Sequence, residues 1–190
     1  MGPFRVVRTT RVADAGFLAL DDLEVETPDG ETVHRSVVRH PGAVVVVPVE
    51  HDEQTALLVR QYRAALDRHV LEVPAGKRDV DGEPPAVTAR RELEEELGLH
   101  AGRVVKLAEF FNTPGFCDEH SHLFVALDLA PADRPKPTSA EERDMTVERI
   151  ALTDVETLVA SRVLHDAKTI IGLLLARQYL AGALTGIDAS

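Results

Sequence analysis

Cysteine is almost missing from this chain: Cys117 is the only one in 190 residues. A single cysteine excludes a disulfide framework within the chain and gives no reason to expect secretion. We interpret Cys117 as an inert thiol, because the sequence offers it no designated histidine or asparagine partner.

Long apolar runs are missing as well. No stretch approaches the roughly 20 residues that a membrane-spanning helix needs, and the first ten residues, MGPFRVVRTT, lack the apolar core of a signal peptide. We therefore expect a cytoplasmic protein that makes no contact with a membrane.

Positive charge is scarce: 21 Lys and Arg stand against 32 Asp and Glu, giving a formal net charge of -11. Nucleic-acid-binding proteins need basic patches, so this balance argues against a nucleic-acid partner. A small anionic substrate stays compatible, because metal ions and a few arginines can reverse the field inside one cleft. The length favours one domain with a small N-terminal addition.

The feature that the sequence does have is a cluster of carboxylates. Glu92, Glu95 and Glu96 stand at positions i, i+3 and i+4 within residues 76–99, GKRDVDGEPPAVTARRELEEELGL. A helix turns by about 100° per residue, so the three side chains should share an arc roughly 100° wide. Carboxylates this close repel each other, and a bound Mg²⁺ or Mn²⁺ would compensate them. A solvated acidic helix face is the alternative.

The same segment carries signals for the helix itself. The pair Pro84-Pro85 favours a helix start, and Gly98 favours a stop. Glu94 lies about 200° from Glu92 and should point to solvent, which makes it an internal control. The apolar stripe beside the acidic arc consists of Ala86, Ala89, Leu93 and Leu97. The three glutamates should therefore line the edge of a core.

This segment resembles the Nudix hydrolase signature, G-x5-E-x7-R-E-U-x-E-E-x-G-U, in which U is a bulky aliphatic residue. The matching positions are Gly76, Glu83, Arg91, Glu92, Leu93, Glu95, Glu96, Gly98 and Leu99. One departure is visible, since six residues rather than five separate Gly76 from Glu83. The resemblance implies hydrolysis of a nucleoside diphosphate linked to another moiety X.

Apolar patterns along the rest of the chain predict an α/β sandwich, a mixed sheet with helices on its faces, as the Nudix resemblance also implies. The expected strands cover 23–25, 33–37, 43–47, 55–62, 70–73, 104–111, 121–129 and 145–152, with a hairpin turn at 28–30. A final helix is expected over 166–180, with Asp166 as its N-cap. Its buried face should hold Ala167, Ile170, Ile171 and Leu174.

Two segments indicate the ADP-ribose pyrophosphatase branch of the family. That branch has a proline sixteen residues after the last glycine of the signature, and Pro114 stands there. Residues 139–145, SAEERDM, resemble the acidic loop that supplies the catalytic base in this branch. Glu141 occupies the base position and Glu142 is its rival. The wider segment 131–144 is rich in proline and charge, which predicts a mobile loop; a plain turn at Pro114 and an exposed loop without function are the alternatives.

The resemblance also implies a catalytic arrangement. Glu92, Glu95 and Glu96, with the backbone carbonyl of Ala75, would hold two or three Mg²⁺ ions, or Mn²⁺, against the pyrophosphate. Arg91 would pair with Glu83 or another signature glutamate and fix its position. The products would be AMP and ribose 5-phosphate.

Substrate-binding residues are expected outside the signature. Arg60 and Arg63 flank the end of a predicted strand and are candidates for gripping phosphate or ribose. The resemblance implies that residues 1–40 form an N-terminal β region that builds a homodimer and completes the adenosine pocket of the partner, with 41–190 as the Nudix domain. Aromatic residues make up only 4% of the chain, so Phe17 is one of few platforms for adenine.

Two other readings stay open. The enzyme could cleave another nucleotide sugar or a dinucleotide such as NADH, FAD or a diadenosine polyphosphate. Alternatively, a Nudix-type module could sense ADP-ribose without cleaving it. Such modules typically lose a signature glutamate, and this sequence keeps all of them.

Overall fold

The computed structural model describes residues 2–133 and 139–188. The chain forms two compact units, which we describe separately: one comprises Met1–Ala43 with Phe110–Ser121, and the other comprises Val44–Glu109 with His122–Ser190. Within the described ranges, no helix is both long enough and apolar enough to cross a membrane.

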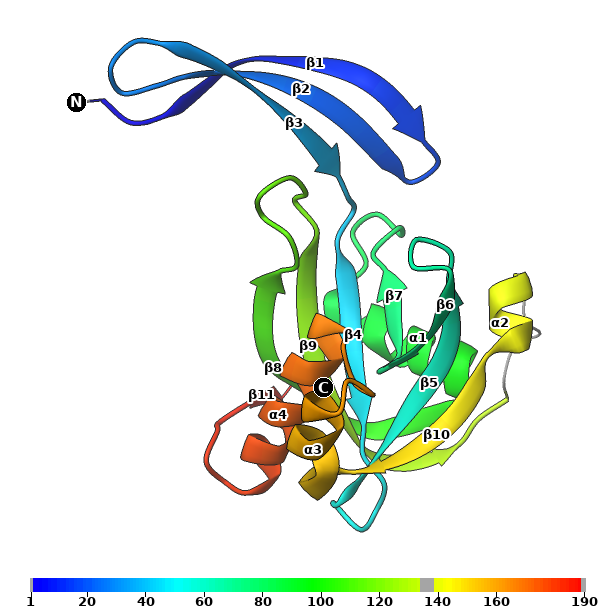
Figure 1. The fold of residues 1–190 in the computed structure, drawn as a ribbon. Coiled ribbons are helices and arrows are strands. Elements are labelled where there is room, and N and C mark those ends of the chain that lie inside the picture. Colours follow the sequence, from blue (N-terminus) through cyan, green and yellow to red (C-terminus); the bar gives the residue numbers. More distant parts are fainter. Residues whose placement is uncertain (1, 134–138, 189–190) are drawn as a thin grey trace. The chain divides into compact units, whose positions relative to one another are not determined.

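The first unit is built on an antiparallel sheet in the order β1-β2-β3 (Figure 1). Its strands are β1 (Arg5–Ala15), β2 (Leu18–Glu26) and β3 (Thr32–Arg39). The hairpin between β2 and β3 confirms the turn expected at 28–30, where Gly30 has a φ of 88°. Strand β1 was not predicted, because every one of its residues is exposed and none of the usual apolar alternation marks it.

The segment 110–121 joins the first unit through backbone pairing with β3. Val38 donates its N–H to Phe116 O at 2.7 Å and accepts from the N–H of Asp118 at 3.2 Å. Cys117, in the same segment, is buried and has a free thiol. This association could not be predicted from sequence patterns, because more than 70 residues separate the segment from the N-terminal strands.

The second unit contains two sheets. A three-stranded sheet has the order β10-β5-β6, made by β5 (Thr55–Arg63), β6 (Arg68–Glu72) and β10 (Thr146–Ala151). The five-stranded sheet has the order β11-β8-β9-β4-β7. Its strands are β4 (Ala43–Pro48), β7 (Ala75–Lys77), β8 (Leu99–Phe111), β9 (His120–Pro131) and β11 (Ile187–Asp188).

Helices cover both faces of this five-stranded sheet, which confirms the predicted α/β sandwich (Figure 1). The helices described in the second unit are α1 (Pro85–Leu97), α2 (Ala140–Asp144), α3 (Val155–Ala160) and α4 (Ala167–Leu180). A 3₁₀ turn at Leu152–Asp154 precedes α3. Successive residues of β4 point to opposite faces. Val44 and Val46 share a buried cluster with Leu93 of α1, whereas Val47 meets Gly172 of α4.

Helix α4 confirms its predicted limits but not its predicted face. Asp166 caps the helix by accepting the N–H of Thr169 at 2.9 Å. The buried positions, however, are Thr169, Gly172, Leu173 and Ala176, while Ala167 is exposed and Ile170, Ile171 and Leu174 are half-buried. Five of the six residues 170–175, IIGLLL, are large aliphatic residues, so the periodicity of the sequence could not identify the inner face of the helix. Gly172 decides it, because a Cβ there would lie 2.9 Å from Val47 Cγ2.

The predicted loop at 131–144 is only partly loop. Residues 134–138 lie outside the described residues, and residues 140–144 form the short helix α2. The side chain of Ser139 caps this helix by accepting the N–H of Glu142 at 3.0 Å. A serine N-cap followed by acidic residues in the first turn was the signal that the composition of the segment obscured.

Candidate active site

Helix α1 holds the three signature glutamates as the sequence predicted. It begins at Pro85, and Gly98 ends it in the left-handed conformation, with a φ of 65° and its N–H donated to Glu94 O at 2.9 Å. Ala89 and Leu93 are fully buried, and Ala86 and Leu97 pack against the same cluster. This apolar face fixes the helix against the sheet and leaves the acidic arc at the edge of the core.

The glutamates differ in how deeply they lie. Glu92 is buried, Glu96 is half-buried and Glu95 is exposed. The Oε2 atom of Glu96 is itself buried and has no hydrogen-bond partner within the described part of the chain. A buried carboxylate oxygen without a partner is costly, so this atom calls for a proton or a cation.

Burial dominates the electrostatics of these carboxylates. Loss of solvation raises the pKa of Glu92 to about 7, although the neighbouring Arg91 opposes the rise. Loss of solvation and the charges of Glu92 and Glu72 raise the pKa of Glu96 to about 8, against the attraction of Arg63 and a hydrogen bond with the backbone of Ala75. In the metal-free protein, Glu92 and Glu96 are therefore partly protonated near neutral pH.

Gly76 on β7 lies directly against Glu92. A Cβ at this position would come within 1.8 Å of Glu92 Cδ and 2.2 Å of its Oε1. No φ in the left-handed region applies to Gly76, so the requirement for glycine is one of space alone. The backbone of β7 and the carboxylate of Glu92 thus form one packed surface.

We expect Gly76→Ala to lower turnover by at least about tenfold, because the added methyl group must displace the Glu92 carboxylate. The expected companion effect is a higher Mg²⁺ concentration for half-maximal activity, measured by metal titration of the purified variant. Gly82→Ala is not a suitable comparison because Gly82 has a φ of 72°, but Gly115→Ala adds a methyl group in open space. Equal activity of Gly76→Ala and the wild type would contradict the packing that we describe.

Arg91 lies among the acidic side chains and links them. Its Nη1 contacts Glu92 Oε1 at 2.8 Å and Glu95 Oε2 at 3.1 Å, and its Nη2 lies 3.6 Å from Glu83 Oε2. Glu83 also accepts a hydrogen bond from Thr88 Oγ1 at 2.7 Å. The single extra residue in the loop therefore does not separate Glu83 from the helix, and the arginine lies within ion-pair distance of three carboxylates.

The two arginines expected to bind substrate have carboxylate partners in this structure. Arg63 forms a two-pronged ion pair with the buried Glu72, at 2.8 and 2.6 Å, and its charge also reaches Glu96. Arg60 pairs with Glu148 on the neighbouring strand β10. The sequence analysis did not single out Glu72, although a glutamate between the apolar residues Leu71 and Val73 was a usable signal.

The two candidate bases, Glu141 and Glu142, occupy the first turn of α2. The side chain of Glu141 is exposed and that of Glu142 is half-buried. Carboxylates in the first turn of a helix are favoured by its dipole. The geometry of this helix is compatible with either residue taking a proton.

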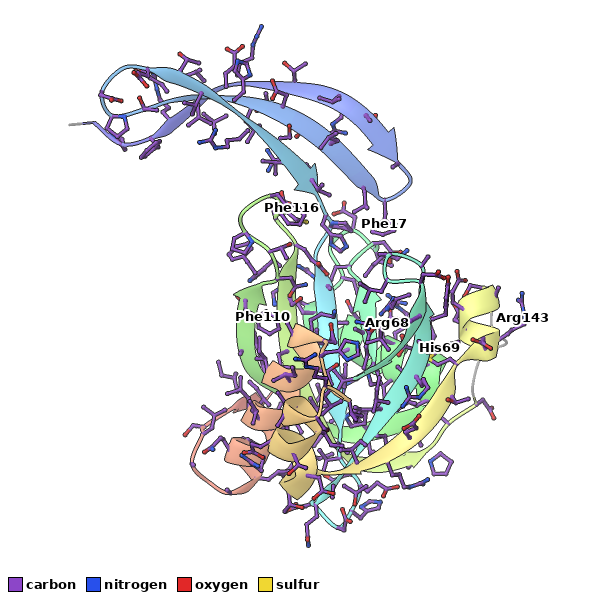
Figure 2. All side chains as sticks on the ribbon, viewed as in Figure 1. Phe17, Arg68, His69, Phe110, Phe116 and Arg143 are labelled. Carbon is purple, nitrogen blue, oxygen red and sulfur yellow. The ribbon has the colours of Figure 1, made fainter. Side chains whose placement is uncertain are left out.

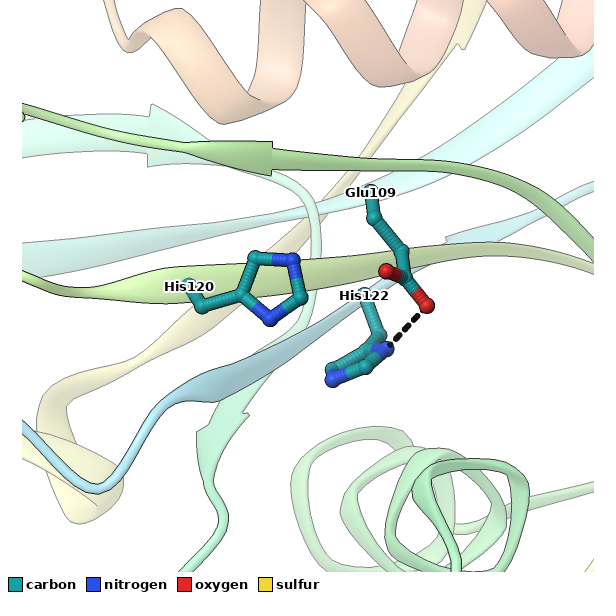
Figure 3. Close-up of side chains that lie close together, drawn as sticks. All are labelled: Glu109, His120 and His122. Carbon is teal, nitrogen blue, oxygen red and sulfur yellow. Dashed lines mark hydrogen bonds and ion pairs between the residues drawn. The ribbon is translucent and has the colours of Figure 1, made fainter.

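A second polar group lies beside the loop that follows β7. His122 is buried on β9, and its Nδ1 lies 3.1 Å from Glu109 Oε1 (Figure 3). On the other side of the ring, Nε2 lies 3.3 Å from Nη1 of Arg78. His120, also drawn in Figure 3, belongs to the first unit. His122 therefore has a polar neighbour at each of its two ring nitrogens.

Phe17 and Pro114 both belong to the first unit. The Phe17 ring is half-exposed and stands edge-on to His40, with centroids 5.4 Å apart (Figure 2). Phe17 and His40 line a cavity of about 360 Å³ together with Arg11 and Arg39. Pro114 lines a smaller cavity of about 210 Å³ beside Cys117 and Asp118. An aromatic ring beside two guanidinium groups is chemistry that suits a planar, anionic ligand.

The donor set on α1 and β7 fits a hard divalent cation. Three carboxylates and a nearby backbone carbonyl are the oxygen ligands that Mg²⁺ and Mn²⁺ prefer. A cation of this kind would compensate the buried oxygen of Glu96, which has no hydrogen-bond partner among the described residues.

Comparisons with known proteins agree with this geometry. The model of the NUDIX domain matches residues 38–171. The chain is 42% identical over 146 residues to an ADP-ribose pyrophosphatase of Bacillus subtilis, covering 77% of each protein. It is 37% identical over 178 residues to a methanol dehydrogenase activator of Bacillus methanolicus, covering 93% of this chain and 91% of the relative. A crystal structure of an ADP compounds hydrolase superposes with a TM-score of 0.81 at 21% identity, covering 96% of both chains.

Proposed function

The chain belongs to the Nudix hydrolase family, and from this premise we propose that it hydrolyses the pyrophosphate of ADP-ribose to AMP and ribose 5-phosphate. The observation that carries the proposal is the complete set of signature glutamates on α1, in which Glu96 presents a buried oxygen without a partner. Similarity to an ADP-ribose pyrophosphatase supports the choice of substrate.

Metal ions are part of the proposal. Glu92, Glu95, Glu96 and the backbone carbonyl of Ala75 would hold Mg²⁺, or Mn²⁺, in a set of two or three ions. Such ions, when bound, neutralise charge on the pyrophosphate and acidify a water molecule. Nudix hydrolases generally use divalent cations, and the oxygen donors described above suit them.

The side chains of this chain would supply the remaining functions. Arg91 holds Glu92, Glu95 and Glu83 in place, so its contribution is to fix the carboxylates before substrate arrives. A glutamate of α2 would accept the proton of the attacking water as its oxygen bonds to phosphorus, and the bridging oxygen of the pyrophosphate would leave with AMP or ribose 5-phosphate.

We assign the base to Glu141. Glu141→Gln should lower turnover by at least about tenfold, and more than Glu142→Gln does, because an amide cannot accept the proton. Each variant is compared with the wild type at saturating substrate and Mg²⁺, and both keep the side-chain volume. If Glu142→Gln is the more severe change, the base is Glu142.

We propose substrate-binding roles for residues within each unit. In the second unit, Arg63 and Arg60 would exchange part of their carboxylate contacts for phosphate or ribose oxygens. In the first unit, Phe17 would stack on adenine in the adenosine pocket of the partner, and Pro114 would shape the loop that contains it. We propose that the first unit also builds a homodimer in the cytoplasm. Exposed apolar side chains on its strands, among them Val6 and Val12, favour a protein partner over open water.

The test of the function is release of AMP from ADP-ribose by the purified protein with Mg²⁺. ADP-glucose, NADH, FAD and diadenosine polyphosphates are assayed beside it, with and without chelator. We expect ADP-ribose to give the highest kcat/KM by tenfold or more and chelator to abolish the activity. A different preferred substrate would change the moiety that we assign to the nucleoside diphosphate but keep pyrophosphate hydrolysis. Inactivity on every substrate would favour a sensing module.

A further inference from the structure

Helix α2, which carries both candidate bases, cannot be stable by itself. It has five residues, and none of them is buried. Isolated helices shorter than roughly 12 residues are marginal in water, so contacts with the rest of the unit must hold this one in place.

Two neighbours of α2 supply such contacts. Met145, the residue directly after the helix, is buried, and Thr146 pairs with Arg60 at the start of β10. Met145 therefore anchors the C-terminal end of α2 to the sheet. At the same end, the Oδ2 atom of Asp144 lies 2.6 Å from Nε2 of His69 on β6, so this nitrogen donates to the carboxylate.

The His69 ring is itself held in position. Tyr62 and His69 are directly opposite each other on β5 and β6, and their rings meet with centroids 5.7 Å apart. The hydroxyl of Tyr62 donates to Asp67 at 2.7 Å, in the turn that joins the two strands. Figure 2 shows His69 on the side of the sheet that faces α2, where Arg143 projects outward.

We propose that His69 and Asp144 form a latch that positions α2, and with it the catalytic base, over the reaction centre. This inference rests on the proposed function, in which the base belongs to α2. His69 and Asp144 are positioning residues: they act through the helix and are not required to touch the substrate. Neither residue belongs to the Nudix signature of residues 76–99.

The latch acts on a local equilibrium rather than on global stability. Both side chains are about half exposed, at 47% for His69 and 60% for Asp144, and exposed ion pairs contribute little to the unfolding free energy. The local folding equilibrium of a short helix is nevertheless sensitive to a weak ion pair, because the free energy that holds the helix in place is itself small. Loss of the pair should lower the population of the closed helix by roughly two- to fivefold.

The experiment compares Asp144→Ala, His69→Ala and the double variant with the conservative variant Asp144→Asn, whose amide oxygen can still accept from His69. A matched control is available in the pair His100–Glu94, another exposed histidine and carboxylate, 3.0 Å apart. Turnover and KM are measured for each variant, and hydrogen exchange of residues 139–148 is measured without substrate.

We expect Asp144→Ala and His69→Ala to lower kcat by roughly two- to fivefold, with KM changed less than about 1.5-fold. Exchange in α2 should be faster in both, and the double variant should be no worse than the more severe single one, because the two residues act as one pair. Asp144→Asn should keep most of the activity. Glu94→Ala and His100→Ala should change neither quantity.

Three results would overturn the latch: unchanged exchange of α2 in Asp144→Ala, faster exchange without a fall in kcat, or an equal fall in kcat in Glu94→Ala. The exchange measurement needs no substrate. If the wild type cleaves none of the substrates tested, the proposed function fails, whereas the contact between His69 and α2 stands or falls by exchange alone.

Discussion

Glu96→Gln should lower turnover by at least about a hundredfold while the protein stays folded. The substitution keeps the size of the side chain and removes the charge at the one signature glutamate whose oxygen is buried without a partner. A neutral amide is a weak ligand for Mg²⁺, so the variant would bind the metal less tightly and the charge on the pyrophosphate would be less well neutralised. Turnover at saturating Mg²⁺ and substrate measures the effect, and circular dichroism checks the fold.

Glu94→Gln is the control for this prediction. Glu94 lies two residues from Glu96 on the same helix, but its carboxylate pairs with His100 at 3.0 Å, away from the other glutamates. The same chemical change there should alter turnover by less than about twofold. Similar losses in the two variants would show that the helix face does not decide which glutamate matters.

The metal-free protein should become less stable as the pH rises from about 5 to about 8. Glu96 has an ordinary pKa near 4.5 when unfolded and a pKa of about 8 when folded, and Glu92 is raised to about 7. The folded state therefore holds protons that the unfolded state has released, so raising the pH through this window favours unfolding. One pKa unit corresponds to about 1.4 kcal/mol, and we expect a loss on the order of a few kcal/mol.

Chemical denaturation at pH 5.5 and pH 8 in the presence of chelator measures this loss. Glu96→Gln should show a weaker dependence, because its amide does not titrate and Glu92 alone remains. Mg²⁺ should restore wild-type stability at pH 8 by favouring the ionised cluster. The carboxyl groups with lowered pKa, such as Asp21 and Asp166, titrate below this window and do not interfere. An identical pH dependence in wild type and variant would contradict the assignment to Glu96.

Local signals explain which parts of the fold and site could be predicted. Helix α1 was predictable because its stop residue, its apolar stripe and its acidic arc all lie within one stretch of sequence. These features depend on neighbours in the chain, so spacing specifies them. The family resemblance implied that Arg91 would pair with Glu83 or another signature glutamate, and Arg91 lies within ion-pair distance of Glu83, Glu92 and Glu95.

Other features depend on residues far apart in the sequence. The burial of Gly172 follows from its contact with Val47, 125 positions earlier, and no periodicity in α4 indicates it. The pairing of His69 with Asp144 likewise joins β6 to α2. The exposed strand β1 lacks an apolar pattern, and only its antiparallel pairing with β2 identifies it as a strand. Such contacts need the tertiary structure.

The close approach of Gly76 to Glu92 has a consequence for variation at these two positions. Because the glycine requirement is one of volume and not of backbone conformation, residue 76 and residue 92 share a single space. A larger residue at one position can be accommodated only by a shorter one at the other, and a shorter acid reaches less far toward a cation. The two positions are therefore coupled, and the room left beside the β7 backbone sets the length of the acid that the site can use.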